Sequence, residues 1–233
     1  MKKLLFGSLI LFFYNVKAQD NNTVVINAAR QNESELVKKM YRYPQFLEGR
    51  AYYKNGGITD SRFNYNYLTN LILFISPKGD TLELAQGESF DKITIGTDTF
   101  CYANKIFIQQ LTHASTCNLF VKTFLRYNGR EKKGAYGGYS STSASSSISE
   151  MYASTGPGVG KLTADENIIY VFDYSYYLSG KFGKFYPATK KGVYDMFSKK
   201  QKQLKEFLET NKIDLNKKED LEKLVEFAST VLK

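Results

Sequence analysis

The chain has 233 residues and a formal net charge of +9, and its length bounds the fold to about one sizeable domain with an appendage. It carries one histidine, His113, which excludes a metal site with two imidazoles from a single chain. Its 18 tyrosines and 17 phenylalanines, without any tryptophan, suit the pleated and half-buried faces of β-sheets.

The amino terminus has the pattern of a cleaved secretory signal. Lys2 and Lys3 precede an apolar run over residues 4–13, and Val16-Lys17-Ala18 offers small residues to a signal peptidase. The run is about half of the ~20 residues that span a bilayer, so a retained anchor is the weaker interpretation. We therefore expect a signal peptide over residues 1–18 and a periplasmic or secreted protein, with no transmembrane segment after cleavage. No cysteine lies near the cleavage site to carry a lipid anchor.

An amino-terminal arm is expected over residues 19–39. The arm is polar, with a short apolar run over residues 24–26 and a weakly helical stretch over residues 33–40. Both an edge strand and a loose arm fit this pattern, and both remain open.

The clearest strand signal lies in residues 63–84. Aromatic residues alternate with asparagines in Phe63-Asn64-Tyr65-Asn66-Tyr67, the period of a strand with one buried face. Residues 71–75 are apolar on both faces, and Ser76-Pro77-Lys78-Gly79 has the composition of a tight turn. Alternation returns in residues 81–84, which predicts an antiparallel hairpin.

Further short strands are predicted, with turn signals every ~8–12 residues. They cover residues 46–53, 93–95, 100–102, 106–108, 119–124, 168–177 and 182–186. This spacing predicts an antiparallel β domain over residues 40–187, formed as a sandwich, a partly closed barrel or paired meanders. An outer-membrane barrel is less favoured, because several strands are short and apolar on both faces.

Residues 134–160 are rich in glycine and serine, and such a segment buries too little apolar area to offset the entropy of ordering it. We expect a mobile loop that serves as a surface linker, and a functional loop is the alternative. The candidates for a surface that stacks on sugars or peptides are Tyr136, Tyr139, Tyr174, Tyr176 and Tyr177. The alternative is that these tyrosines are ordinary core or sheet-face residues.

A lysine-rich helical tail is predicted over residues 188–233, because the apolar period there becomes that of a helix. The residues that form its three apolar faces are Val193, Met196 and Phe197, then Leu204, Phe207 and Leu208, then Leu221, Leu224, Val225, Ala228 and Leu232. Asn216 and Glu219 have the spacing of a capping box at the start of the last helix. The predicted fold class is therefore α+β, an antiparallel β-rich domain followed by a small carboxyl-terminal helical segment.

Most of the positive charge lies in this tail. Cleavage after Ala18 leaves 215 residues and removes three lysines and no acid, so the net charge falls from +9 to +6. Residues 181–233 carry 13 lysines and 8 acidic residues, a net charge of +5, and the interspersed acids favour ordinary solvated helices. The candidates for the alternative, contact with an anionic partner, are Lys199, Lys200, Lys202 and Lys205. We expect no nucleic-acid partner.

No catalytic motif is complete in the sequence. Residues 156–163 resemble a phosphate-binding loop, but Thr155 stands where that motif needs glycine and Leu162 where it needs a hydroxyl. His113 lies in a predicted hairpin turn, and no G-x-S-x-G nucleophile elbow accompanies it. Asp165-Glu166-Asn167 lacks the spacing and the glycine of a calcium loop. Paired carboxylates can perform acid-base chemistry without histidine, but spacing singles out no pair here. The candidates are Glu83, Glu88, Asp91 and Asp98.

The two cysteines, Cys101 and Cys117, survive signal cleavage. The segment between them predicts strands on either side of a third strand. Two strand spacings of about 4.8 Å separate such positions by roughly 10 Å, which exceeds the Cα separation that a disulfide tolerates. We therefore expect two free thiols.

The cleavage motif before Gln19, the Phe63–Tyr67 strand, the Lys78-Gly79-Asp80-Thr81 turn and the lysine-rich tail together resemble a group of exported, β-rich proteins of Bacteroidota-type bacteria. The resemblance spans most of the mature chain and rests on structural motifs. It implies an exported compartment and a β-rich architecture with a helical tail, and it transfers no active site.

The sequence favours a non-catalytic, exported binding or scaffold protein of the bacterial envelope, with a glycan, a lipid or an envelope protein as partner. It assigns no catalytic, cofactor-binding or metal-binding residue, and no cofactor. The alternative is a carrier that holds a small ligand or lipid in a cavity between sheets, and a hydrolase comes third. A buried apolar cavity would favour the carrier, whereas a cleft with two facing carboxylates of shifted pKa would favour the hydrolase.

Overall fold

The computed structural model describes residues 22–27, 38–114, 116–133, 139–141, 166–180 and 183–232. The predictions for the signal peptide, for Tyr136 and for most of the glycine- and serine-rich loop lie outside the described residues. Among the described helices, none combines the length and the apolar run that a membrane crossing needs.

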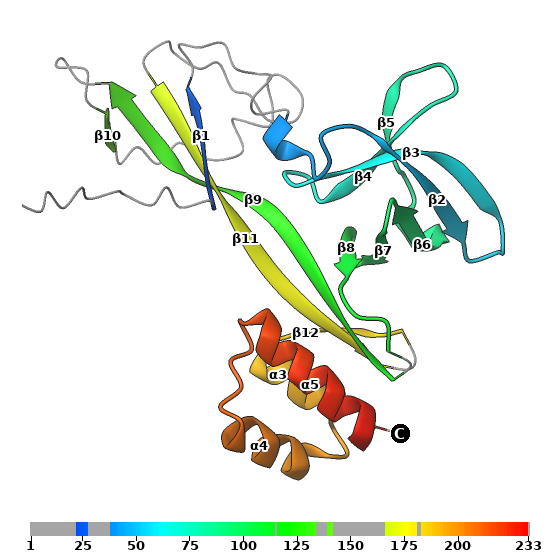
Figure 1. Ribbon diagram of the computed structural model, residues 1–233, viewed down its shortest axis with the longest axis vertical. Coiled ribbons are helices and arrows are strands. Elements are labelled where there is room, and N and C mark those ends of the chain that lie inside the picture. The colour runs from blue at the N-terminus through cyan, green and yellow to red at the C-terminus, as the bar shows by residue number, and fades with distance from the viewer. Residues whose placement is uncertain are drawn as a thin grey trace, which may run out of the picture.

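In the described part of the chain, twelve strands form one antiparallel sheet and three helices follow late in the sequence, which confirms the predicted α+β class (Figure 1). The strands are β1 (Thr23–Asn27), β2 (Leu47–Tyr53), β3 (Ile58–Asn66), β4 (Leu71–Ile75), β5 (Thr81–Glu83), β6 (Phe90–Ile95), β7 (Asp98–Ala103), β8 (Ile106–Gln110), β9 (Cys117–Lys133), β10 (Tyr139–Ser141), β11 (Glu166–Gly180) and β12 (Phe185–Pro187). The helices are α3 (Lys190–Met196), α4 (Gln201–Thr210) and α5 (Lys218–Val231), and a short 3-10 helix covers Gly87–Ser89.

The sheet consists of two meanders. One runs β2-β3-β4-β5, the other runs β6-β7-β8-β9-β11, and the pairing of β2 with β6 joins them. The order of the described strands ends at two edges, β1 and β5, so the sheet is not closed into a barrel. Of the three predicted arrangements, paired meanders is the one observed.

The predicted hairpin of residues 63–84 is present. β4 pairs with β5 from Leu73 opposite Glu83 to Ile75 opposite Thr81. Gly79 closes the turn with a φ of +91°, a conformation that glycine adopts without strain, and its N–H donates to the Ser76 carbonyl at 2.9 Å. The turn chemistry in the sequence therefore fixes the register of this hairpin.

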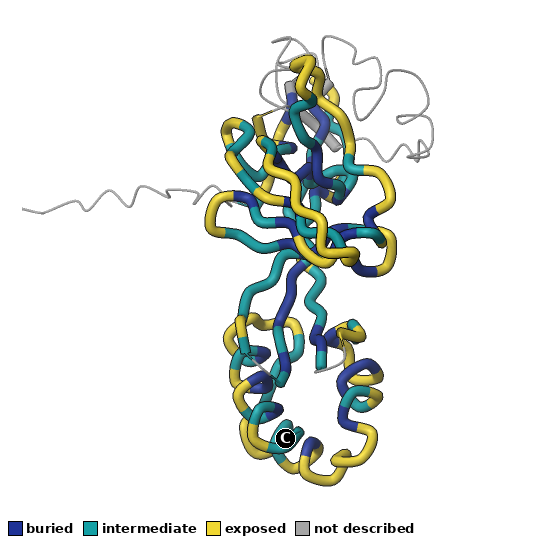
Figure 2. Tube along the Cα trace, turned by 90° about the vertical axis from the view of Figure 1, so that its right-hand side faces the viewer, coloured by how far each residue is buried: buried dark blue, intermediate teal, exposed yellow. Residues whose placement is uncertain are grey.

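The longest elements are β9 and β11, with 17 and 15 residues, and together they form a ribbon that runs the length of the molecule (Figures 1 and 2). They pair from Glu166 opposite Lys132 to Gly180 opposite Cys117. A bulge between Ile169 and Tyr170 leaves Asn128 opposite no residue, and Gly129 there has a φ of +126°. The sequence predicted residues 119–124 of β9 and 168–177 of β11, so it missed most of β9 and the two ends of β11.

The middle of the ribbon is held by the meander of β2 to β5. The Leu125 N–H donates to the Tyr67 carbonyl at 2.9 Å, and the Asn70 side-chain amide donates to the Thr123 carbonyl at 3.2 Å. The Tyr65 hydroxyl donates to the Phe107 carbonyl at 3.2 Å and its ring stacks on Phe100 at 5.2 Å. The turn between β3 and β4 thus supplies hydrogen bonds to β9 just beyond Val121, where the pairing with β8 ends.

The three helices cover one face of the other end of the ribbon (Figure 1). Leu119 of β9 and Leu178 of β11 are fully buried in one cluster with Leu204, Leu224 and Ala228. The last helix begins differently from the prediction. Its N-cap is Lys217 with no side-chain cap, so the expected capping box of Asn216 and Glu219 is wrong. The Asp220 carboxylate instead accepts the Asp214 N–H at 3.1 Å, which fixes the approach to the helix.

Two segments outside the predicted strands also join the sheet. β1 pairs with β11 along its whole length and buries Val24 and Ile26, so this part of the arm is an edge strand. Residues 38–40 are helical. Tyr139–Ser141 pairs with β9 as β10, so the expectation of a mobile loop is wrong for these three residues. Backbone pairing to a strand that already exists offsets their unfavourable composition.

Replacing Leu119 with alanine is expected to lower the free energy of unfolding by about 2–5 kcal/mol, because the side chain is fully buried between ribbon and helices. Leu82, also in a strand but 47% exposed, is the matched control, and Leu82→Ala is expected to cost less than about 0.5 kcal/mol. Urea unfolding followed by circular dichroism measures both variants. Equal losses would contradict the packing of helices on the ribbon.

Candidate functional site

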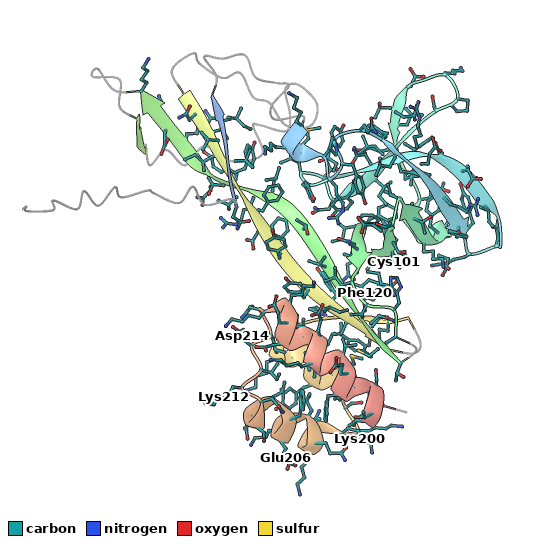
Figure 3. All side chains as sticks on the ribbon, in the orientation of Figure 1. Cys101, Phe120, Lys200, Glu206, Lys212 and Asp214 are labelled. Atoms are coloured by element: carbon teal, nitrogen blue, oxygen red, sulfur yellow. The ribbon has the colours of Figure 1, made fainter. Side chains whose placement is uncertain are left out.

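A cleft of about 810 Å³ lies at the base of the ribbon, on the face opposite the helices. Neighbouring side chains of a strand point to opposite faces of the sheet. Leu119 and Leu178 therefore enter the helical core, while Phe120 and Ser179 form the floor of the cleft. In Figure 3, Phe120 on the ribbon and Cys101 on β7 lie next to each other at this position, and both line the cleft.

The walls of the cleft come from segments that are far apart in the chain. The turn after β2 and strands β6 and β7 form one wall, and the turn from β11 into β12 forms the other. Phe90 and Phe120 are almost completely buried, with 4% and 3% exposed, so they act as an apolar base. Tyr102 and Phe185 are half-buried and complete the aromatic lining.

The rim of the cleft is cationic. Lys54, Lys92 and Lys184 line it, and Asp91 is the one acidic residue among its lining residues. Within the described part of the chain, none of the three lysines has a carboxylate oxygen within 4.0 Å. We call this site the lysine-rimmed cleft.

Two of these lysines lie over aromatic rings in place of carboxylates. The Lys92 Nζ is 5.1 Å from the centre of the Tyr52 ring, and the Lys184 Nζ is 4.8 Å from the Tyr186 ring. A cation–π contact orients an ammonium group and leaves its positive charge uncompensated. The charge of the rim is therefore available to an anion that enters from solvent.

The thiol of Cys101 lies in this cleft and is protonated at neutral pH. Burial and the Asp91 carboxylate raise its pKa to about 11, although nearby Lys92 acts in the opposite direction. A nucleophilic cysteine needs the reverse, a pKa lowered by a cation or a helix amino terminus. Cys117 lies on the other ribbon face in the helical core, where burial raises its pKa to about 12. Both thiols are free, as predicted.

Amide side chains supply the neutral polar groups of the cleft. Asn104 stands in the turn after β7 with an exposed side chain and a φ of +52°. Asn118 holds the loop before β9, because its amide accepts the Ala114 N–H at 2.7 Å and donates to the Ala114 carbonyl at 2.8 Å. The Gln110 amide donates to the Thr112 carbonyl at 2.7 Å. These bonds fix two of the three amides in place.

The predicted tyrosine surface is divided by the ribbon. Tyr174 is 48% exposed, and Tyr176 on the same face packs against the helical core. Tyr177 points to the opposite face and packs with Phe120 and Ile108. Tyr139 lies in β10 at the far end of the ribbon, and Tyr136 is outside the described residues. Among the described tyrosines, the ribbon therefore keeps Tyr174 and Tyr176 on one face and places Tyr177 on the other.

The predicted lysine contact residues lie on the helical segment, away from the cleft. Lys199 and Lys200 precede α4, and Lys202 and Lys205 lie on it, all four with exposed side chains (Figure 3 labels Lys200). Lys205 is 3.9 Å from Glu209, one helical turn later. Such a pair favours the solvated-helix interpretation for Lys205.

The remaining candidates give no second chemical site. His113 is exposed in the loop after β8, as predicted. Over the described residues, no three His, Cys, Asp or Glu side chains gather as a metal site requires. Of the four carboxylates that the sequence could not rank, Asp91 lines the cleft and Asp98 joins a hydrogen-bond cluster; Glu83 and Glu88 are exposed.

The Asp98 cluster is the other polar concentration in the fold. The Asp98 carboxylate accepts hydrogen bonds from the Arg42 guanidinium at 2.9 Å, the Tyr43 hydroxyl at 2.5 Å and the Gln109 amide at 2.9 Å. Burial and the hydrogen bond to Asp98 raise the pKa of Tyr43 far above its ordinary value. With three donors on one carboxylate, this cluster fastens residues 42–43 to β7 and β8 and favours a structural role.

Comparisons with known proteins add no relative. No protein-family model, no curated protein and no solved structure matches the chain.

The cleft was not predicted from the sequence, because its lining residues come from separate segments and each is ordinary where it stands. Asp91 and Cys101 were noted individually, and only strand register places them together.

Asp98→Asn is expected to lower the free energy of unfolding by about 1–3 kcal/mol, since it removes a charged acceptor from a half-buried guanidinium. Asp60 is the matched control because it pairs with Arg50 at 2.6 Å on an exposed surface. Asp60→Asn is expected to leave stability nearly unchanged. Urea unfolding at pH 7 measures both variants, and a silent Asp98→Asn would refute the fastening role.

Iodoacetamide is expected to alkylate Cys101 at pH 8 about tenfold more slowly than a cysteine in a free peptide. A pKa of about 11 lowers the thiolate fraction at pH 8 by roughly two orders of magnitude. The more basic thiolate is also a stronger nucleophile, and this raises the rate by about one order of magnitude. The rate is expected to rise about tenfold per pH unit from pH 7 to 9, following the thiolate fraction.

Cys117 is the internal control in this experiment, since it is fully buried and its pKa is about 12. It is expected to react more slowly than Cys101 at every pH. Mass spectrometry of the alkylated peptides separates the two rates. Labelling of Cys117 before Cys101 would contradict the placement of Cys101 in an open cleft.

Proposed function

We propose that this protein is an exported, non-catalytic binding module of the bacterial envelope, and that the lysine-rimmed cleft holds an anionic ligand. The single observation that carries the proposal is the rim of three lysines without carboxylate partners over an aromatic base. A rim of one charge sign concentrates ligands of the opposite sign and steers their entry. The export signal at residues 1–18 supports an envelope location.

The lining of the cleft supports binding in preference to catalysis. General acid-base chemistry uses groups whose pKa lies near the working pH. The cleft offers one carboxylate, Asp91, and one thiol, Cys101, whose raised pKa keeps it protonated. A hydrolase with a carboxylate pair would need a second acid within reach of Asp91, and the lining residues do not include one.

The chemistry of the rim also ranks the ligand classes. A lipid carrier encloses its acyl chain in an apolar cavity. The lysine-rimmed cleft opens to solvent and presents lysines, amides and one acid at its mouth. An acyl chain there would face charged groups, so an anionic ligand with polar groups, such as a charged glycan, is favoured over a lipid tail.

Neutralising the rim is expected to weaken binding to dextran sulfate, a polyanion used here as the probe. The variant Lys54→Gln/Lys92→Gln/Lys184→Gln is expected to lose about tenfold in affinity at 50 mM NaCl, since three partly exposed ion pairs contribute about 1.5 kcal/mol together. Biolayer interferometry measures the affinity. Neutral dextran, which has the same backbone without sulfate, is expected not to bind.

The matched control removes three lysines from the helical segment. The variant Lys199→Gln/Lys200→Gln/Lys202→Gln changes the net charge by the same amount and leaves the cleft intact. It is expected to lose less than about twofold in affinity, because none of those side chains lines the cleft. Equal losses in the two variants would assign binding to overall charge, and no loss in the cleft variant would refute the proposal.

A further inference from the structure

The lysine-rimmed cleft is larger than a single anion requires. Its volume of about 810 Å³ falls within the range of about 300–1,000 Å³ of sites that hold whole cofactors and drug-sized ligands. Its three lysines stand on separate segments, at the turn after β2, on β6, and at the turn from β11 into β12. One carboxylate or phosphate therefore contacts only some of the rim lysines, whereas a ligand with several anionic groups on an extended frame contacts all three.

The lining also indicates the kind of frame. Phe90 and Phe120 are almost completely buried, so they offer an apolar floor and no open ring face of the kind on which a flat base stacks. The exposed Asn104 amide stands beside that floor, and the amides of Gln110 and Asn118 each keep one N–H beyond their bonds to Thr112 and Ala114. These groups match the hydroxyl groups of sugars. Apolar floor, neutral amides and cationic rim together fit sugar rings that carry carboxylates.

The two walls of the cleft belong to different parts of the fold. Lys54 and Lys92 belong to the meanders, whereas Lys184 directly precedes β12 and Phe185 is its first residue, shortly before α3. β12 is only three residues long and contacts α3 directly. A ligand that reaches both walls therefore links the meanders to the helical segment.

We propose that the lysine-rimmed cleft binds an acidic oligosaccharide that spans from the β6–β7 wall to the turn between β11 and β12. This inference rests on the proposed function and names its ligand class. The carboxylates contact Lys54 or Lys92 at one end and Lys184 at the other, and the sugar rings cover Cys101 and Phe120. Chain length is then expected to determine affinity, because a ligand longer than one sugar can contact lysines of both walls at once.

Protection of Cys101 from iodoacetamide at pH 8.5 tests this proposal on the full mature chain. Trigalacturonate is expected to slow alkylation of Cys101 at least fivefold at saturation and to leave Cys117, in the helical core, unchanged. Galacturonate is expected to need at least tenfold higher concentrations for the same protection, and the neutral trisaccharide maltotriose is expected to give none. Equal protection by monomer and trimer would overturn the spanning geometry.

The Lys184→Gln variant tests the second wall, with Lys202→Gln on α4 as the matched control. Lys184→Gln is expected to raise the half-protecting concentration of trigalacturonate about fivefold and to leave that of galacturonate within twofold. Lys202→Gln is expected to change neither. Equal effects of Lys184→Gln on monomer and trimer would overturn the bridging role.

Vesicles containing phosphatidylglycerol separate the two proposals. Protection of Cys101 by these vesicles but not by trigalacturonate would overturn the saccharide and leave an anion-binding cleft. Failure of trigalacturonate, vesicles and dextran sulfate alike to protect Cys101 would overturn the proposed function together with this inference.

Discussion

The pairing of β9 with β11 is the interaction on which the rest of the fold depends. A two-stranded ribbon by itself is at best marginally stable in water, so both ends must be covered. β1 pairs near one end, the turn between β3 and β4 binds the middle of β9, and the helices cover one face of the other end (Figure 1). Because alternate side chains face opposite ways, the residues that anchor the helices also determine which residues line the cleft.

This alternation explains how one short piece of ribbon has two environments. Leu119 lies in a dry helical core, while its neighbours Asn118 and Phe120 line a cleft that opens to solvent. A shift of register by one residue would exchange these environments, placing an amide in the core and leucine in the cleft. The bulge at Gly129 lies above this region, so it adjusts the far end of the ribbon without disturbing the register at the cleft.

The sequence predicted the elements whose signals are local. Alternating aromatics marked β3, turn residues marked the β4–β5 hairpin, and apolar spacing marked the three helices. The upper half of β9 was missed because charged residues such as Arg126 and Glu131 mask the strand period, where the β9 side chains beyond Leu125 are exposed or only partly buried. The cleft was missed for a different reason: its lining residues meet only through pairings between strands far apart in the chain, which no local pattern encodes.

The described acids are paired differently in the sheet and in the helical tail. Acids of the sheet are held by arginines, in the pairs Arg42–Asp98, Arg50–Asp60 and Arg126–Asp173. Arginine suits this role because its planar fork fixes a carboxylate in a set geometry.

In the helical tail, Lys205, Lys217, Lys218 and Lys223 pair with acids within or next to their own helices. Other described tail lysines, such as Lys199, Lys200 and Lys202, have no carboxylate oxygen within 4.0 Å and lie exposed outside the cleft. The lysines of the cleft differ because they gather around one hollow with an aromatic base. This arrangement makes them the better receptor for an anionic ligand.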